Sequence, residues 1–478
     1  MTPPALLRRT ARAAVAVWLS CAAIAGAQTP DTLRLSAADA VARMLRLSDE
    51  ARISNAQVEL AGAQILTARA AGLPQLRLAS TYSQVIKNAR ATVVGSVFGQ
   101  SYNYNTNLLL QQSFFQGGRI VAGSQVAARS ERAALASRDE LRASLAVDAQ
   151  RAYLNAIFTA RLAVIQRQNL ALADDRLAQV EQLERAGRSS RYDVLRARVE
   201  RANIEPLTLQ SENDRTLAEL ELKRLLQIPL AQPVTLTTDL AVDAIRALAD
   251  SAAADISPAG VRPGVRATEL TASARDAAVK VARADLLPTL SASFTYGYLA
   301  LPSANGLPDR LGRTSNAYCP AGSPSTRICQ NNGWFPDRSF GVQMSWPLFD
   351  GLRTKGAIDL AQAQAKIADL QVQQAREQAN VDVQRAVAEL TRARASFTAR
   401  STNVSEAEEA FQLATLRYGR GVGTQLEVSD AQLALLTARS TEARATFDLF
   451  LAVAELARVR ARPIPLPGGG TVALGTSR

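Results

Sequence analysis

The sequence has 478 residues and a formal net charge of +12, and its composition is 47% hydrophobic but only 5% aromatic. Apolar content carried largely by alanine favours long, closely packed helices over a thick globular core. The sequence contains no histidine, which removes His-dependent base catalysis and the commonest transition-metal ligand, so an enzyme, a metal site and a bound cofactor are all disfavoured.

Residues 1–27 have the pattern of an export signal. The positively charged start contains Arg8, Arg9 and Arg12, and a short apolar stretch follows at residues 13–24. Ala25-Gly26-Ala27 then has the small-residue pattern of a cleavage site. The apolar stretch is too short to span a bilayer as a helix. A retained anchor and a lipidated Cys21 are the alternatives, although Trp18 stands where lipoprotein signals usually carry leucine. We therefore expect the chain to be exported.

Each half of the remaining chain begins with two segments in which large apolar residues alternate with small polar ones. The predicted strands are about 75–88 and 102–115, and about 289–299 and 338–348. This alternation is typical of a soluble sheet on a core, or of a barrel wall with lipid outside and water inside. Four strands cannot close a barrel, and an open sheet in lipid leaves edge groups unsatisfied. The second interpretation therefore requires several chains to share one barrel of eight, twelve or sixteen strands.

The two strands of the second half are separated by a stretch rich in Pro, Gly, Asn and Ser that contains Cys319 and Cys329. In an oxidising compartment two such cysteines are expected to form a disulfide that closes the loop. Two free thiols are the alternative, and a metal site built on two thiolates without histidine is a weaker one.

A long run without Gly or Pro follows each pair of strands, from Ser124 to Ala186 and from Ala357 to Tyr418. As α-helices these runs would each reach roughly 90 Å. The second carries an apolar residue at every seventh position, at Val383, Leu390, Phe397, Val404 and Phe411. A seven-residue apolar repeat is typical of coiled coils. We predict long helices at about 119–186 and 353–418.

Both long helices are expected to end at a glycine, Gly187 or Gly421, that suits a left-handed C-terminal cap. Return helices are predicted at about 190–227 and 424–460. They begin with Ser190-Arg-Tyr-Asp193 and Thr424-Gln-Leu-Glu427, which have the capping-box pattern. Pro206 is expected to kink the first return helix.

The two halves follow one plan. The strings VDAQRA at 147–152 and VDVQRA at 381–386 lie 234 positions apart, and the same shift aligns residues 115–222 with 349–456 without a gap. The chain therefore divides into a first repeat at 28–230, an inter-repeat segment at 231–264, a second repeat at 265–462, and a tail at 463–478 that is predicted to be disordered.

Three stretches carry a resemblance to a known family: RADLLPTLSASFTYGY, FGVQMSWPLFDGLRTKGAIDLA and YGRGVGTQLEVSDAQLAL. With the doubled plan, they resemble the TolC-like outer membrane efflux proteins (outer membrane factors) over roughly residues 33–460. The resemblance implies a mainly α fold with a β-barrel. A homotrimer would close a 12-stranded barrel in outer-membrane lipid above a long periplasmic α-helical tunnel. A small equatorial domain would come from residues 228–264 and the C-terminal end.

The same resemblance implies a passive exit duct for small molecules. The duct would be loaded by a periplasmic adaptor (a membrane fusion protein) and an inner-membrane pump. A type I protein-secretion duct, and a periplasmic coiled-coil adaptor or scaffold without a pore, are the alternatives. Nucleic-acid binding is disfavoured, because an exported chain with dispersed arginines is better explained by solvated helix surfaces.

By motif position, the resemblance places the periplasmic entrance at Asp193, Tyr418, Glu427 and Asp430, and the adaptor-docking tips at Gly187-Arg188-Ser189-Ser190 and Gly421-Val422-Gly423-Thr424. Asp193 and Glu427 have a competing role as the acidic members of capping boxes. Asp430 has no such role, and three copies around a narrow axis would attract cations. Members of the family can carry, at the position of Gly423, a basic residue that links neighbouring coils near the entrance. Because Gly423 has no side chain, other contacts are expected to keep the entrance closed here.

Overall fold

The computed structural model describes residues 32–86, 102–238, 242–255, 260–300 and 334–472. The predicted export signal and the predicted Cys319–Cys329 disulfide lie outside these residues. The chain divides into two compact units, one formed by residues 1–53, 140–262 and 380–478 and the other by residues 54–139 and 263–379. In the part of the chain that the model describes, no helix combines the length and apolar character needed to cross a membrane.

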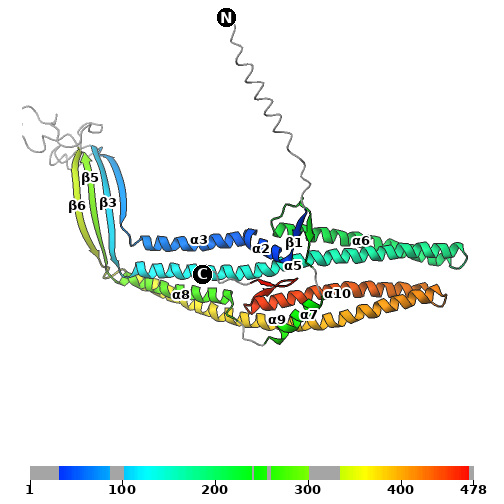
Figure 1. Cartoon of the computed structure of the whole chain (residues 1–478). Coiled ribbons are helices and arrows are strands. Elements are labelled where there is room, and N and C mark those ends of the chain that lie inside the picture. Colours follow the sequence, from blue (N-terminus) through cyan, green and yellow to red (C-terminus); the bar gives the residue numbers. More distant parts are fainter. Residues whose placement is uncertain (1–31, 87–101, 239–241, 256–259, 301–333, 473–478) are drawn as a thin grey trace, which may run out of the picture. The chain divides into compact units, whose positions relative to one another are not determined.

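Two pairs of long helices carry the repeat (Figure 1). They are α5 (Arg119–Arg185) with α6 (Arg191–Leu225), and α9 (Arg353–Gly419) with α10 (Gln425–Val459). Every bound of the second pair lies 234 positions after its counterpart in the first, so the sequence repeat is also a structural repeat. Helix α6 continues through Pro206 as one element.

A four-stranded antiparallel sheet lies in the second unit (Figure 1). Its strands are β2 (Gln75–Gln84), β3 (Tyr102–Gln116), β5 (Thr289–Ala300) and β6 (Trp334–Ser345), in the order β2-β3-β5-β6. The two halves of the chain meet at the β3–β5 pair, where Asn107 lies opposite Gly297. Both outer strands are exposed along almost their whole length. Among the residues that the model describes, β2 and β6 each have a single neighbouring strand, so the sheet described has two free edges.

Three further helical elements complete the second unit. They are most of α3 (Asp49–Ala70), α8 (Pro263–Arg283) and the 3-10 helix η2 (Ala284–Leu286). Helix α8 packs on α9 through Ala272, which is buried with Ala368 and Val372. Two alanines and a valine therefore form the buried part of the α8–α9 contact.

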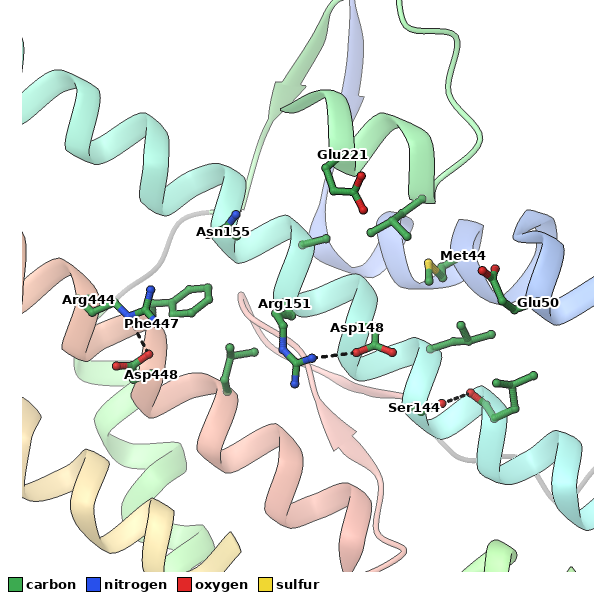
Figure 2. Close-up of a pocket in the computed structure, with 15 residues that line it drawn as sticks. Met44, Glu50, Ser144, Asp148, Arg151, Asn155, Glu221, Arg444, Phe447 and Asp448 are labelled. Carbon is green, nitrogen blue, oxygen red and sulfur yellow. Dashed lines mark hydrogen bonds and ion pairs between the residues drawn. The ribbon is translucent and has the colours of Figure 1, made fainter. Parts of the chain in front are cut away.

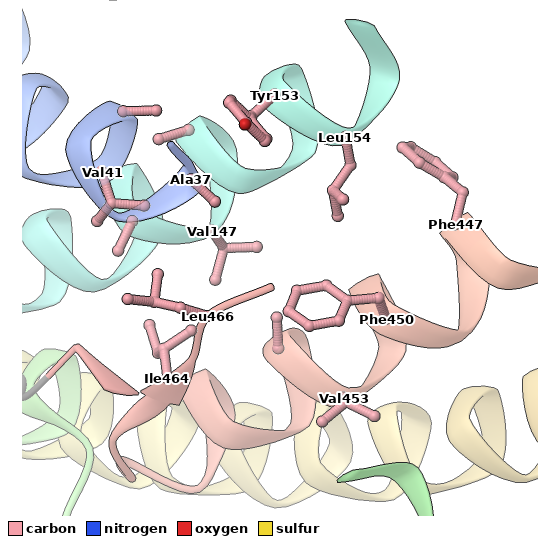
Figure 3. Close-up of a cluster of buried hydrophobic side chains, with 14 of the residues drawn as sticks. Ala37, Val41, Val147, Tyr153, Leu154, Phe447, Phe450, Val453, Ile464 and Leu466 are labelled. Carbon is pink, nitrogen blue, oxygen red and sulfur yellow. The ribbon is translucent and has the colours of Figure 1, made fainter. Parts of the chain in front are cut away.

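The core of the first unit lies where α5, α9 and α10 pass a small mixed domain (Figure 3). That domain contains β1 (Leu33–Leu35) paired in parallel with β4 (Val234–Leu236), together with α2 (Ala37–Leu47) and α7 (Val242–Ala254). Tyr153 of α5 is fully buried, and its hydroxyl donates to the Leu35 carbonyl at 2.9 Å and accepts from the Thr238 N–H at 3.1 Å. One tyrosine thus fixes both strands to the long helix.

The C-terminal end differs from the sequence prediction. Disorder was expected from residue 463, but this prediction is wrong for residues 463–472, which form a short hairpin of β7 (Ile464–Pro465) and β8 (Thr471–Val472). Ile464 and Leu466 are buried in the core of the first unit (Figure 3). The prediction was based on the Pro- and Gly-rich composition and did not take into account these two apolar side chains, whose burial is favourable by about 1.5–3 kcal/mol each. Residues 473–478 lie outside the described chain.

Candidate functional site

The candidate site lies in the first unit, at the turns that join each long helix to its return helix (Figure 1). Gly187 and Gly421 adopt φ values of +70° and +78°. The N–H of Arg188 donates to the Leu183 carbonyl at 2.8 Å, and the N–H of Val422 donates to the Arg417 carbonyl at 3.0 Å. This is the Schellman pattern of a left-handed C-terminal cap, so the predicted caps are confirmed.

Asp193, in the first turn of α6, is the acidic member of a complete capping box. The Ser190 hydroxyl accepts from the Asp193 N–H at 3.2 Å, and the Asp193 carboxylate accepts from the Ser190 N–H at 3.1 Å. The Ser190 and Ser189 hydroxyls also donate to this carboxylate. These bonds, first among them the one from the Ser190 side chain, lower the pKa of Asp193. The capping box is by itself a sufficient reason for an acidic residue at position 193.

Replacing Asp193 by asparagine is expected to destabilise the first turn of α6 by about 1 kcal/mol, because it weakens the cap. The folded-state pKa of Asp193 is depressed, so its contribution is complete above the pKa of an unfolded aspartate, near 4, and is lost as the pH falls through the lower folded value. Hydrogen exchange of the α6 N-terminus between pH 3 and 6 measures this. Protection that falls equally with acid in the Asp193→Asn protein would contradict the assignment.

Glu427 of α10 forms only one of the two hydrogen bonds of the predicted capping box. Its N–H donates to the Thr424 hydroxyl at 3.3 Å, but its carboxylate lies beside Arg417, with Oε2 3.5 Å from Nε. That ion pair joins the end of α9 to the start of α10 across the turn. Both side chains are more than two-fifths exposed, so the pair contributes little to stability.

Tyr418 takes part in a contact between the two helical hairpins that sequence reasoning missed. The Arg176 guanidinium of α5 lies 5.6 Å from the centre of the Tyr418 ring, and its Nη2 donates to the Gln425 carbonyl at 3.2 Å. Burial lowers the pKa of Arg176. Arg176 therefore holds the α9–α10 turn against α5.

Two further hydrogen bonds join the hairpins near the same turn. The buried Gln432 side chain donates to the Asn169 side-chain oxygen at 2.7 Å, and the Ser429 hydroxyl donates to Glu200 at 2.9 Å. The sequence signal for such bonds is a polar residue within an apolar helix seam, because such residues set register in coiled coils. Asn169, whose repeat partner is Asn403, carries that signal.

Asp430 differs from the other three predicted entrance residues. It is exposed, and its side chain forms no hydrogen bond or ion pair with any residue in the described ranges. The absence of a basic side chain at Gly423 has a steric reason. A Cβ there would lie 3.0 Å from the Arg417 Cβ and 3.2 Å from the Tyr418 nitrogen. The tight α9–α10 turn favours glycine at this position.

A cavity of about 720 Å³ lies elsewhere in the first unit, between α5, α10 and the start of α3 (Figure 2). Both of its arginines are paired with an aspartate of their own helix, Arg151 3.1 Å from Asp148 on α5 and Arg444 3.1 Å from Asp448 on α10. Burial raises the pKa of Asp148. These contacts are those of helix surfaces and do not resemble a catalytic arrangement.

The fold is that of outer-membrane channels. It is similar to the outer membrane protein VceC from Vibrio cholerae, at 21% identity over 91% of this chain and 96% of that chain, with a TM-score of 0.68. The CmeC outer membrane channel of Campylobacter jejuni has 15% identity over 91% and 86%, with a TM-score of 0.70. The open MtrE channel of Neisseria gonorrhoeae has 19% identity over 92% and 91%, with a TM-score of 0.67.

The family model described as outer membrane efflux protein matches residues 44–226 and 260–461, one match for each structural repeat. The chain therefore belongs to the outer membrane efflux protein family. A search of curated protein sequences found no match. The resemblance inferred from the sequence is confirmed.

Membership of this family defines what the chain is. It is an outer-membrane channel for efflux, with its helical tunnel in the periplasm. The family is one of ducts and not of enzymes, and its channels work as trimers with adaptor and pump partners.

Proposed function

We propose that three copies of this chain form a homotrimer that conducts small molecules passively out of the periplasm. The two free edges of the four-stranded sheet carry this proposal. In lipid, unpaired N–H and C=O groups on β2 and β6 cost several kcal/mol each, and cyclic symmetry pairs β6 of one copy with β2 of the next. Three copies then supply twelve strands, enough for a closed barrel around a water-filled channel.

The helix turns form the periplasmic end of this duct. The entrance is assigned to Asp193, Tyr418, Glu427 and Asp430, and the two turns at 187–190 and 421–424 are the docking tips for a periplasmic adaptor that connects to an inner-membrane pump. Within the tips, Arg188 and Val422 support this role. Both are exposed, and their side chains have no part in the caps that build the turns.

Conductance of the detergent-purified protein in a planar bilayer tests the function. We expect the protein to require detergent for release from membranes, to migrate as a trimer, and to give discrete conductance steps. Release without detergent would favour a pore-less periplasmic scaffold. Folded, membrane-inserted trimers that never conduct would overturn the channel proposal.

The double substitution Arg188→Glu and Val422→Asp is expected to abolish export without preventing assembly. It retains Gly187, Gly421 and the capping residues Ser190 and Thr424, so the turns keep their backbone geometry. Export is measured as the drug resistance of cells that lack any other channel of this family. Assembly is measured as the yield of trimer. Full resistance with normal trimer would reject the docking role.

A further inference from the structure

The four-stranded sheet has one apolar face, and a single charged residue, Arg338 of β6, lies on it. Arg338 lies opposite Tyr296 of β5, and Tyr296 lies opposite Leu108 of β3. Side chains alternate between the two faces of a sheet, so every second residue of each strand shares this face. Its large apolar members include Leu76, Leu78, Leu110, Phe294, Phe340 and Val342. In the four strands that the model describes, no other position on this face is charged.

No carboxylate of the described sheet lies on the apolar face. Asp337 is the only acidic residue of the four strands. It lies opposite Gly297, and Gly297 lies opposite Asn107, so Asp337 is on the polar face. Strand β2, which pairs with β6 of the next copy in the proposed trimer, contains no acidic residue. Arg338 therefore has no carboxylate partner on a strand of its own copy or of β2 of the next, whatever the register between copies.

Tyr296 orients the Arg338 side chain. The guanidinium carbon lies 4.8 Å from the centre of the Tyr296 ring, and the Tyr296 hydroxyl accepts a hydrogen bond from the guanidinium. The Tyr298 ring lies 6.1 Å from the Tyr296 ring. Arg338 is exposed and forms no ion pair with a described residue. A guanidinium has five N–H donors in a planar fork, so donors remain for a further partner with several oxygens, such as a phosphate.

The strands run from the periplasmic helices towards the outside. Strand β3 is followed by α5 and β6 is followed by α9, so the strand ends at Gln116 and Ser345 face the periplasm. The opposite strand ends, at Tyr102 and Trp334, face the exterior. Arg338 is the fifth residue of β6, close to the exterior end.

Arg338 lies near the level at which a membrane barrel passes from lipid tails to headgroups. Trp346, directly after β6, is 55% exposed and suits the periplasmic aromatic girdle. The eight positions from Trp346 to Arg338 cover about 27 Å along the strand, or about 20 Å across the membrane at a tilt of about 40°. The apolar band of such barrels is about 25 Å tall. Beyond Arg338 the face carries Tyr298 and then Trp334, which suit the outer girdle.

We propose that Arg338 binds a phosphate group of the phosphorylated glycolipid that forms the outer leaflet of the outer membrane. This inference rests on the proposed barrel. A cation on a lipid-facing surface is costly to bury unless it has an anionic partner, and the phosphates of the outer leaflet supply one at this level. The apolar neighbours Leu108 and Phe340 then contact the acyl chains of the same lipid. Three copies provide three equivalent sites around the barrel.

Retention of lipid A by the detergent-purified, full-length trimer tests the site. The trimer is incubated with lipid A that carries both phosphates and is then washed, and the lipid A retained per trimer is measured by its fatty acids. Arg338→Gln is expected to lower retention by about tenfold or more, the factor that a hydrogen bond between charged groups contributes. Arg338→Lys is expected to retain an intermediate amount, because an ammonium group has the charge but not the planar fork.

Arg77→Gln is the matched control. Arg77 is an exposed arginine of β2 and lies opposite Leu109, which places it on the polar face of the same sheet. Its removal is expected to leave lipid A retention at the wild-type level. Equal losses in the Arg77→Gln and Arg338→Gln proteins would show that retention depends on overall charge and would overturn the proposal.

Changing the lipid tests the wild-type protein without any substitution. Lipid A from which both phosphates have been removed is expected to be retained about tenfold less, as in Arg338→Gln. Equal retention of the two forms would overturn the proposal, and so would phosphatidylglycerol that displaces lipid A at equal concentration. Wild-type trimers that conduct but ignore the phosphates would reject the lipid site and leave the proposed function intact. Trimers that retain lipid A through Arg338 but never conduct would support the site and count against the proposed function.

Discussion

Replacing Gly117 by alanine is expected to disrupt the junction between β3 and α5 and to prevent most of the protein from reaching the folded trimer. Gly117 has a φ of +60°, a region that costs a residue with a Cβ about 1–3 kcal/mol. The added Cβ would also clash with the Ala284 carbonyl oxygen and approach the Leu287 Cβ to 3.0 Å. Together these effects place the expected loss at about 3 kcal/mol or more.

The adjacent Gly118→Ala variant is the control for this prediction. Gly118 has a φ of +82°, but an added Cβ would have no neighbour within 4 Å. This variant bears only the conformational cost, about 1–2 kcal/mol. The yield of folded trimer and its resistance to denaturant measure both effects. Equal losses in the two variants would show that the contact with Ala284 is unimportant.

Replacing Arg262 by alanine is expected to destabilise the first unit by about 1.5–3 kcal/mol, because it removes hydrogen bonds between charged groups at two partly buried carboxylates. Glu140 keeps its ion pair with Arg458 at 3.2 Å, and Asp382 keeps Arg385 at 4.0 Å. Arg262 Nη1 lies 2.7 Å from Asp382 of α9, and Nη2 lies 2.7 Å from Glu140 of α5. The three side chains are only about one-fifth exposed. One arginine therefore links the two long helices. Denaturant unfolding followed by the loss of helical signal measures the change.

The control for Arg262 is Arg376→Ala. Arg376 pairs with Glu269 at 2.6 Å, but its side chain is 61% exposed, and such pairs contribute about 0–1 kcal/mol. Adding Asp382→Asn to the Arg262→Ala protein is expected to recover part of the loss, because a neutral amide costs less to bury than a carboxylate that has lost its ion pair at 2.7 Å. A loss no larger than that of Arg376→Ala would contradict the role of burial.

The fold was predictable to the extent that local rules determine it. The runs without Gly or Pro, the glycines at 187 and 421, and the cap at Ser190 fix where the long helices begin and end. The 234-residue shift predicted that the two hairpins would share their bounds, and they do. The strand alternation predicted a sheet, although not the order that joins β3 to β5.

The candidate site was predictable only in part. Motif position located the turns and proposed Asp193, Tyr418, Glu427 and Asp430 for the entrance, but it gave no contacts for them. The contact of Arg176 with Gln425 joins residues 249 positions apart, and no local pattern marks it. The tail also escaped prediction, because a Pro- and Gly-rich composition argues for disorder unless a core is available to bury Ile464.

The sequence by itself determined the elements, their doubling and the family, since helix length, capping and strand alternation depend on neighbours within a few residues. Only the tertiary structure decided which charges are paired. It placed Arg262 between Glu140 and Asp382, turned Glu427 towards Arg417, and left Asp430 exposed. The physical reason is that the pairing of a charge depends on which distant helix packs beside it, and that is decided by the core and not by the local sequence.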